Sequence, residues 1–252
     1  DLGPRYDVSR RRPLPHLAVR DLWVRYGGVT ALAGVNIEVF AGTIVGVIGP
    51  NGAGKTSLID ASNGFVPAEG SITLAGVDLS QLSPHRRALA GLGRTFQGPD
   101  LCDDLTVLEN VLAGDVGTRR DNATASQVAV GLLQRFGLEL DADALVSTLS
   151  MGRRRLVSIA RSLAARPTVL MLDEPAAGLD TTESRWLAQR LQAVRDDGTA
   201  ILLVDHDIDL VFDICDRVIV IDLGQIIATG TPAEIRAHPN VVSAYLGSSA
   251  DL

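Results

Sequence analysis

The sequence predicts an α/β fold with a mostly parallel sheet, and three observations carry this prediction. Short apolar runs typical of buried strands recur along the chain, and segments of helical periodicity alternate with them. A glycine-rich loop, residues 49–54, joins the most compact of these runs to a helix. The 252 residues, 46% of them hydrophobic, suffice for one large domain with a small insertion. Strands that alternate with helices in this way are typical of a parallel sheet with crossover connections.

Most of the predicted strands lie in the first 80 residues of the chain. Residues 16–24 and 34–40 are expected to be strands, and residues 43–48 form a β-branched run between glycines that is typical of a buried parallel strand. A helix is expected from about Lys55 to Asn63, and residues 70–79 are expected to form a hairpin.

The second half begins with a helical pattern at residues 101–148, which indicates an inserted α-helical subdomain. A helix follows from Arg154 to Ala165, with apolar side chains at three- and four-residue spacing, and Pro167 stops it. Strands and helices then alternate over residues 169–172, 183–194, 200–204, 210–215 and 218–222. A capped final helix is predicted by Thr231, Pro232 and Glu234.

The glycine-rich loop predicts a binding site for a nucleoside triphosphate. Residues Gly49-Pro50-Asn51-Gly52-Ala53-Gly54-Lys55-Thr56 match the pattern G-x-x-x-x-G-K-[ST] between a predicted strand and a predicted helix. Glycines allow the backbone N–H groups to face phosphate oxygens, and the helix N-terminus adds favourable partial charge. Lys55 is expected to contact the β- and γ-phosphates, Thr56 to offer its hydroxyl to Mg²⁺, and Ser57 to line the same site.

Three polar residues follow predicted parallel strands. Asp173 ends the run at 169–172, so its carboxylate is expected at the carboxyl edge of the sheet, where it can hold Mg²⁺. Glu174 lies on the opposite side of an extended backbone and is the candidate general base for γ-phosphate hydrolysis. His206 comes just after the strand at 200–204, and parallel strands end at the same edge. We therefore expect His206 to contact the γ-phosphate.

Further candidates lie outside these strand ends. Gln97 is a candidate catalytic residue and Mg²⁺ ligand that connects the core to the helical insert. Tyr26 is the candidate for stacking on the adenine ring, with Trp23 as the competing aromatic residue.

A second anion site is indicated at the start of the helix near residue 154. Ser150 and the N–H groups around Gly152 are the groups expected to form it, although the serine taken alone is only a helix N-cap. The chain has one phosphate loop, so this second site is expected to serve another nucleotide or the nucleotide of another subunit.

These motifs together resemble the nucleotide-binding subunit of ABC transporters over about residues 17–247. The elements that carry the resemblance are the phosphate loop, Gln97, Leu149-Ser150-Met151-Gly152, Asp173-Glu174-Pro175, Ala177-Gly178-Leu179-Asp180 and His206. The resemblance implies an ABC ATPase domain at residues 16–252, with a P-loop NTPase core, an antiparallel N-terminal part and a helical subdomain at about 98–165. It also implies ATP and Mg²⁺ as cofactors. Two subunits would pair head to tail, with Ser150 and Gly152 acting in trans and Asp180 at the dimer interface.

Finer features resemble the branched-chain (hydrophobic) amino acid importer branch of this family; they lie at residues 26–32, 93–97, 173–179 and 244–247. This resemblance implies a peripheral subunit on the cytoplasmic face of the membrane. It would drive a permease, with a substrate-binding protein as an indirect partner. Residues 98–105 are the expected docking surface for the permease.

Two positions depart from the family pattern. Arg153 stands where glutamine is usual, and its charge is expected to contact the partner's nucleotide or to repel Lys55. Asp205 stands where glutamate is more usual, which is a small change.

Charge, hydropathy and motif content disfavour several other classes of function. The net charge of −7 argues against a nucleic-acid partner, and no apolar stretch approaches the roughly 18 residues of a membrane span. An ABC ATPase of another transporter, for urea, lipid or export, stays open. A soluble ABC ATPase without a transporter is less favoured, because such proteins carry two cassettes or a long coiled coil. A GTPase is disfavoured by the lack of an Asn-Lys-x-Asp element after the loop.

The N-terminal residues 1–15 are basic and rich in proline, and they are interpreted as a linker. Because the sequence starts at Asp1, this linker is either a remnant of trimming or expression, or the junction to a permease in one fused polypeptide.

Overall fold

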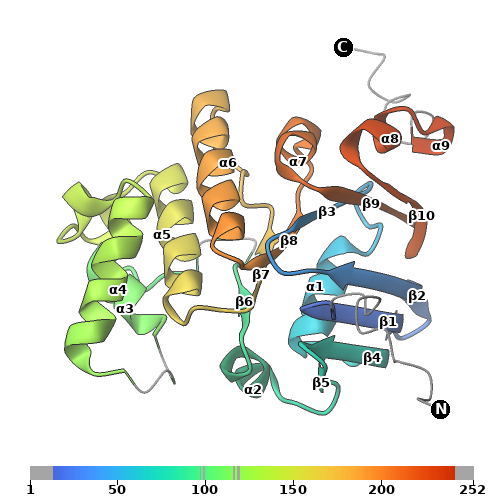
Figure 1. The fold of residues 1–252 in the computed structure, drawn as a ribbon, viewed down its shortest axis with the longest axis horizontal. Helices are drawn as coiled ribbons and strands as arrows, with labels where there is room; N and C mark the ends of the chain where they lie inside the picture. The colour runs from blue at the N-terminus through green and yellow to red at the C-terminus, as the bar shows by residue number, and fades with distance from the viewer. Residues whose placement is uncertain (1–13, 97, 99, 116, 118–119, 242–252) are drawn as a thin grey trace, which may run out of the picture.

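The computed structural model describes residues 14–96, 98, 100–115, 117 and 120–241. Two sheets form its framework (Figure 1). The smaller sheet is antiparallel and has the strand order β2-β1-β4-β5. Its strands are β1 (Leu17–Tyr26), β2 (Val29–Val39), β4 (Glu69–Leu74) and β5 (Val77–Asp78). It confirms the predicted antiparallel N-terminal part and the hairpin at 70–79.

The larger sheet has the order β10-β9-β3-β8-β7-β6, and all its neighbouring pairs are parallel except β9 with β10. Its strands are β3 (Ile44–Ile48), β6 (Leu92–Arg94), β7 (Val169–Asp173), β8 (Ala200–Val204), β9 (Arg217–Asp222) and β10 (Gln225–Gly230). The mostly parallel α/β fold is therefore confirmed.

The central strands are continuous apolar runs because both faces of the larger sheet are covered. In β7, Val169 and Met171 join the cluster shared with the smaller sheet, whereas Leu170 and Leu172 join the cluster on the opposite face. Alternation along the strand then puts Asp173 on the same face as Val169 and Met171.

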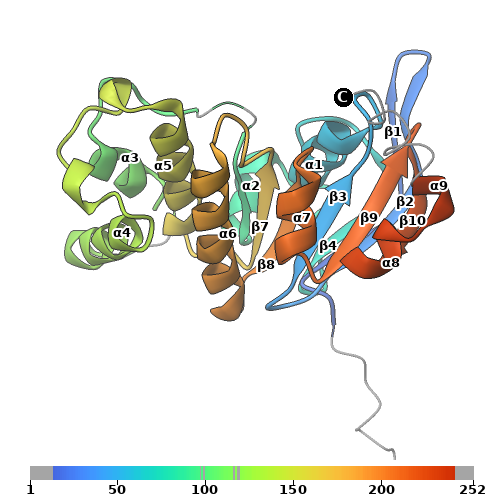
Figure 2. The same ribbon diagram turned by 90° about the horizontal axis from the view of Figure 1, so that it is seen from above.

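Helix α1 (Lys55–Asn63) lies between the two sheets, and its buried Leu58 and Ile59 belong to the cluster that joins them. The other face of the larger sheet is covered by α5 (Met151–Ala164), α6 (Thr181–Asp196) and α7 (Ile208–Ile214), as Figure 2 shows from above. The phosphate loop thus leads into a helix that is enclosed on two sides.

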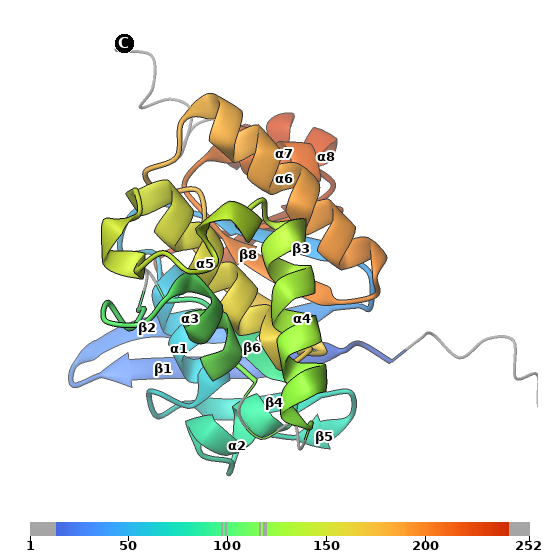
Figure 3. The ribbon, with the colours of Figure 1, turned by 90° about the vertical axis from the view of Figure 1, so that its left-hand side faces the viewer.

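Helices α3 (Val107–Ala113) and α4 (Asn122–Arg135) pack with α5 at the end of the molecule farthest from the smaller sheet (Figure 3). Short 3-10 turns at Glu139–Asp141 and Val146–Thr148 lead from α4 into α5. The helical character predicted for residues 101–148 is present in the described part of this segment. The boundaries of a subdomain at about 98–165 stay a prediction.

Several elements differ from the sequence expectations. The strands β6 and β10 and the helix α2 (Pro84–Leu89) were not predicted. Helix α5 begins at Met151 rather than Arg154, because Ser150 caps it. The capping box of α8 (Pro232–Arg236) is confirmed by Thr231 and Glu234, and a last short helix, α9 (Pro239–Val241), follows. Among the described residues, every helix is too short or too polar to cross a membrane.

Candidate functional site

The phosphate loop connects β3 to α1 with a backbone that requires glycine. Gly52 and Gly54 have φ values of 81° and 105°, in the left-handed region. A Cβ atom on Gly54 would lie 2.4 Å from the carbonyl oxygen of Ala31. Gly54 is the N-cap of α1, no side chain caps this end, and the first turn holds no acidic residue. The helix N-terminus is therefore suited to an anion such as phosphate.

The ammonium group of Lys55 lies within this loop. Its Nζ donates hydrogen bonds to the carbonyl oxygens of Gly49, at 2.7 Å, and Pro50, at 3.0 Å. Burial lowers the pKa of Lys55, while the nearby carboxylates of Glu174 and Asp173 oppose this shift. The end of β7 and the phosphate loop are thus close enough to interact electrostatically.

Asp173 is suited to hold a cation. The residue is 1% exposed, and within the described part of the chain neither of its carboxylate oxygens has a hydrogen-bond partner. Burial raises the pKa of Asp173 to about 6, and the charge of Arg94 opposes the rise. Thr56 lies exposed in the first turn of α1. Mg²⁺ needs only one or two protein carboxylates when phosphates and waters complete its shell, so these two residues fit it.

The conformation of Glu174 differs from the expectation of an extended backbone, which was wrong. Glu174 has a φ of 48°, in the left-handed region, because the chain turns as soon as β7 ends. Its N–H still donates to the carbonyl oxygen of Val204 at 2.7 Å, and its own carbonyl accepts from Ala177 at 3.2 Å. The side chain reaches the sheet edge from this turn.

The side chains of His206 and Glu174 lie close together, near the ends of two neighbouring strands. The pairing of Asp173 with Val204 aligns the ends of β7 and β8. His206 Nδ1 lies 3.9 Å from Glu174 Oε1, and the His206 side chain is 60% exposed. The pair lies at the carboxyl edge of the sheet, with His206 exposed and Glu174 partly buried.

Gln97 lies outside the described residues, but the residues before it are well packed. Thr95 Oγ1 accepts a hydrogen bond from the N–H of Asp173 at 3.3 Å. The guanidinium of Arg94 lies 5.1 Å from the ring centroid of Phe65 and 4.6 Å from that of Phe96, and it forms an ion pair with Asp60 at 2.7 Å. Arg94 was missed as a site residue, since its burial depends on aromatic rings from two separate segments.

Arg155 is a second cation that sequence reasoning missed. It is 4% exposed, and its Nη1 donates to the carbonyl oxygen of Phe96 at 3.2 Å. Burial lowers the pKa of Arg155, and the carboxylates of Asp205, Glu174 and Asp173 oppose this shift. A signal existed in the sequence: Arg155 is one turn before Ile159, so a charge occupies the buried face of an amphipathic helix.

Tyr26 ends β1 close to the first turn of α1. Its hydroxyl donates to Ser57 Oγ at 3.4 Å, and the residue is 46% exposed. The competing aromatic residue, Trp23, has other contacts: its indole N–H donates to Asp21, and the guanidinium of Arg25 lies 4.9 Å from its ring centroid.

Ser150 and Gly152 form the N-terminus of α5. Ser150 accepts a hydrogen bond from the N–H of Arg153 at 3.3 Å. A Cβ atom on Gly152 would lie 2.9 Å from Leu179 and 3.1 Å from Glu183, so glycine allows α5 to approach the start of α6. Figures 1 and 2 both show α5 apart from α1, with β7 between them.

The structure gives Arg153 a partner that the sequence did not indicate. Its side chain forms an ion pair with Asp141, with Nε at 2.6 Å from the carboxylate, and Nη2 donates to the carbonyl oxygen of Gly137 at 3.0 Å. Within one chain, the charge of Arg153 is therefore balanced by Asp141 at the helical end of the molecule.

Comparison with known proteins agrees with this geometry. Residues 32–177 match the family model "ABC transporter", and residues 225–251 match "Branched-chain amino acid ATP-binding cassette transporter". The high-affinity branched-chain amino acid transport ATP-binding protein LivG of Escherichia coli K12 is 39% identical, over 93% of this chain and 99% of its own. The lipopolysaccharide export system ATP-binding protein LptB of the same organism is 37% identical, over 92% and 97%.

Solved structures support the same assignment. The ADP conformation of MJ1267, an ATP-binding cassette of an ABC transporter, has a TM-score of 0.84 and is 29% identical, over 93% of this chain and 99% of its own. The dimeric structure of the bacterial ABC transporter cassette MJ0796 has a TM-score of 0.78 and is 25% identical, over 86% and 98%. The chain thus belongs to the ABC transporter family and is the ATP-binding subunit, an ATPase, of a branched-chain amino acid transporter.

Proposed function

We propose that this subunit hydrolyses ATP with Glu174 as the general base and thereby drives the import of branched-chain amino acids through a membrane permease. The observation that carries the proposal is the 3.9 Å approach of His206 Nδ1 to Glu174 Oε1 at the sheet edge that adjoins Lys55.

Nucleotide binding is assigned to the phosphate loop and its surroundings. The backbone of residues 49–54, with Lys55 and Ser57, holds the phosphates, and Tyr26 stacks on the adenine ring. Thr56, Asp173 and Gln97 hold Mg²⁺, which neutralises phosphate charge when it is bound. The buried and unpartnered carboxylate oxygens of Asp173 support this assignment.

Hydrolysis is assigned to the pair at the ends of β7 and β8. The oxygen of the attacking water forms a bond to the γ-phosphorus, and Glu174 accepts a proton from that water. At the same time the bond between the γ-phosphorus and the oxygen that links it to the β-phosphate breaks. His206 contacts the γ-phosphate and holds it in line with that water.

A second copy of the chain, or a homologous subunit, completes the site. Ser150 and Gly152 contact the γ-phosphate held by the partner, and Asp180 lies at the dimer interface. The separation of α5 from α1 within one chain supports action in trans, and so does the dimeric form of the MJ0796 cassette.

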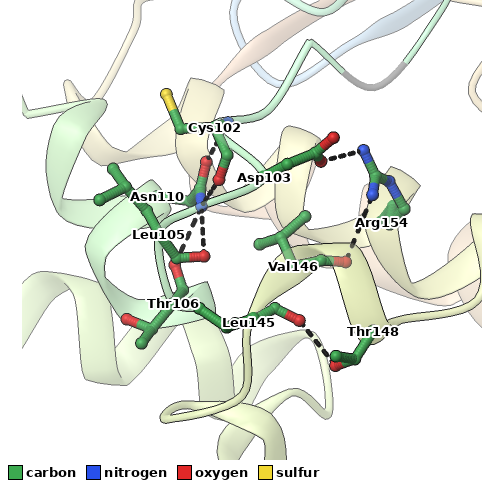
Figure 4. A network of polar contacts seen from close by, with 9 residues as sticks. All are labelled: Cys102, Asp103, Leu105, Thr106, Asn110, Leu145, Val146, Thr148 and Arg154. Carbon is green, nitrogen blue, oxygen red and sulfur yellow. Dashed lines mark hydrogen bonds and ion pairs between the residues drawn. The ribbon is translucent and has the colours of Figure 1, made fainter.

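The permease docks on residues 98–105, on the cytoplasmic face of the membrane, and a substrate-binding protein acts through it. Figure 4 shows how the described part of this segment is held. The fully buried Asn110 bonds to the backbone of Cys102, at 2.9 and 3.0 Å, and to the carbonyl of Leu105. Arg154 pairs with Asp103 at 2.6 Å. A movement of residues 102–105 caused by the permease would therefore be transmitted to α3 through Asn110 and to the first turn of α5 through Arg154.

Branched-chain amino acids are favoured over lipid as the cargo because residues 225–251 match the branched-chain model, although LptB is nearly as similar as LivG. Uptake of labelled leucine and lipopolysaccharide release, measured with the co-purifying permease in vesicles, distinguish the two. Lipopolysaccharide release without uptake of leucine would contradict the import proposal.

The general-base assignment is tested by Glu174→Gln. The variant is expected to bind ATP, to lose hydrolysis and to accumulate as a dimer in size-exclusion runs with ATP. Lys55→Ala, which should lose nucleotide binding, and the exposed Glu139→Gln, which should behave as wild type, are the controls. Turnover by Glu174→Gln at the wild-type rate would exclude Glu174 as the base.

A further inference from the structure

Asp205 connects the two loops that carry Glu174 and His206. These loops follow β7 and β8, and strand pairing aligns them only as far as the N–H of Glu174, which donates to Val204. Beyond that point another contact is needed to keep the loops in register.

The carboxylate of Asp205 makes that contact. Its Oδ2 accepts a hydrogen bond from the N–H of Ala176, two residues after Glu174, at 3.2 Å. Its Oδ1 accepts from the N–H of His206 at 2.8 Å and from that of Asp207 at 3.0 Å. The residue is 1% exposed, so these bonds are shielded from water.

A purely local role does not account for this arrangement. The N-cap of α7 is Asp207, whose side chain accepts from the N–H of Leu210. Asp205 therefore does not cap that helix, and its bond to Ala176 links chain segments 29 residues apart.

We propose that Asp205 is a positioning residue for ATP hydrolysis: its carboxylate holds the Glu174 loop against the His206 loop at the separation that the reaction needs. This inference rests on the proposed roles of Glu174 and His206. Asp205 does not touch the nucleotide and acts only through the two residues that it aligns.

Asp205→Asn tests the link with little change in size. Whichever way the amide is oriented, it cannot accept from Ala176 on one side and from His206 and Asp207 on the other. We expect kcat to fall about tenfold or more, because small displacements of reacting groups have large effects on rate. The KM for ATP and the rise in Tm on ATP binding should stay within about twofold of wild type, because the phosphate loop is not altered.

Asp207→Asn is the matched control. It removes the same charge two residues away, and asparagine is as good an N-cap as aspartate. Wild-type kcat in Asp205→Asn would overturn the proposal, as would parallel losses of kcat, ATP binding and Tm, which indicate general damage. Asp205→Glu keeps both acceptor oxygens, and glutamate is the more usual residue at this position in the family, so this variant should retain the wild-type kcat. If Asp205→Asn melts below the assay temperature, its kcat and KM are compared with those of the wild type at one common temperature below its Tm. A lowered kcat with unchanged KM supports the proposal, and an unchanged kcat overturns it.

The double variant Asp205→Asn/Glu174→Gln separates this inference from the general-base assignment. If Asp205 acts by aligning Glu174 with His206, this alignment no longer matters once the base is removed, so the residual rate of the double variant equals that of Glu174→Gln alone. An active Glu174→Gln contradicts the proposed function itself. An inactive Glu174→Gln with a wild-type Asp205→Asn contradicts only the role of Asp205.

Discussion

The imidazole Nδ1 of His206 lies 3.9 Å from the carboxylate Oε1 of Glu174, although the two residues are 32 positions apart and follow different strands. Parallel strands bring such residues together because their carboxyl ends share one edge. The pair also shares a neighbour, since Asp205 Oδ1 lies 3.6 Å from the same imidazole nitrogen.

The contribution of His206 can be measured with His206→Ala. We expect kcat to fall about a hundredfold, the range for loss of one group that contacts transferring charge, while KM for ATP changes little. Steady-state ATPase assays check this, with the exposed His85→Ala as control. A large rise in KM at constant kcat would instead assign His206 to ground-state binding.

Asp173 makes the stability of the ligand-free protein depend on pH. Its folded-state pKa of about 6 lies above the ordinary 3.8, so the fold favours the protonated form. The contribution of Asp173 to the free energy of unfolding is fully present below pH 3.8 and is lost as the pH rises through about 6. Asp173→Asn is therefore expected to stabilise the ligand-free protein by up to about 3 kcal/mol at pH 8, and by less at pH 5.

Urea unfolding of wild type and Asp173→Asn at pH 8 and pH 5 checks this prediction. The exposed Asp104→Asn is the control for loss of one negative charge. A stabilisation that grows as the pH falls would contradict the assignment. In the wild type, Mg²⁺ is expected to add stability to the protein with ATP bound. Asp173→Asn should lose most of that added stability.

Arg153→Gln is expected to leave ATPase kinetics and dimer formation within about twofold of wild type, because the guanidinium is engaged by Asp141. The pair is partly exposed, with side-chain exposures of 40% and 24%, so its loss should cost less than about 1 kcal/mol, and less still at high salt. A tenfold change in ATPase rate would show that Arg153 reaches the partner's nucleotide after all.

The site residues that the sequence predicted belong to motifs whose spacing is local. The loop from Gly49 to Thr56 needs only its glycines and the helix that follows, and Ser150 caps α5 through the N–H of Arg153 three residues on. Asp173 could be placed because it directly follows a buried apolar run, and His206 because it lies two residues after another.

The missed elements lack such local signals. Strand β6 has three residues at the sheet edge, and β10 has six residues in which buried and exposed side chains do not alternate regularly. Each becomes a strand by pairing with a neighbour, β7 or β9, so its identity depends on the sheet already formed.

The sequence by itself determined the class of fold, the phosphate loop and the order of the polar strand ends, because these depend on periodicity and on contacts within a few residues. Only the tertiary structure decided the direction of Arg153, the left-handed turn at Glu174 and the contacts of Arg155 and Asp205. The partners of Arg155 and Asp205 lie 59 and 29 residues away, and local spacing carries no information about contacts of that kind.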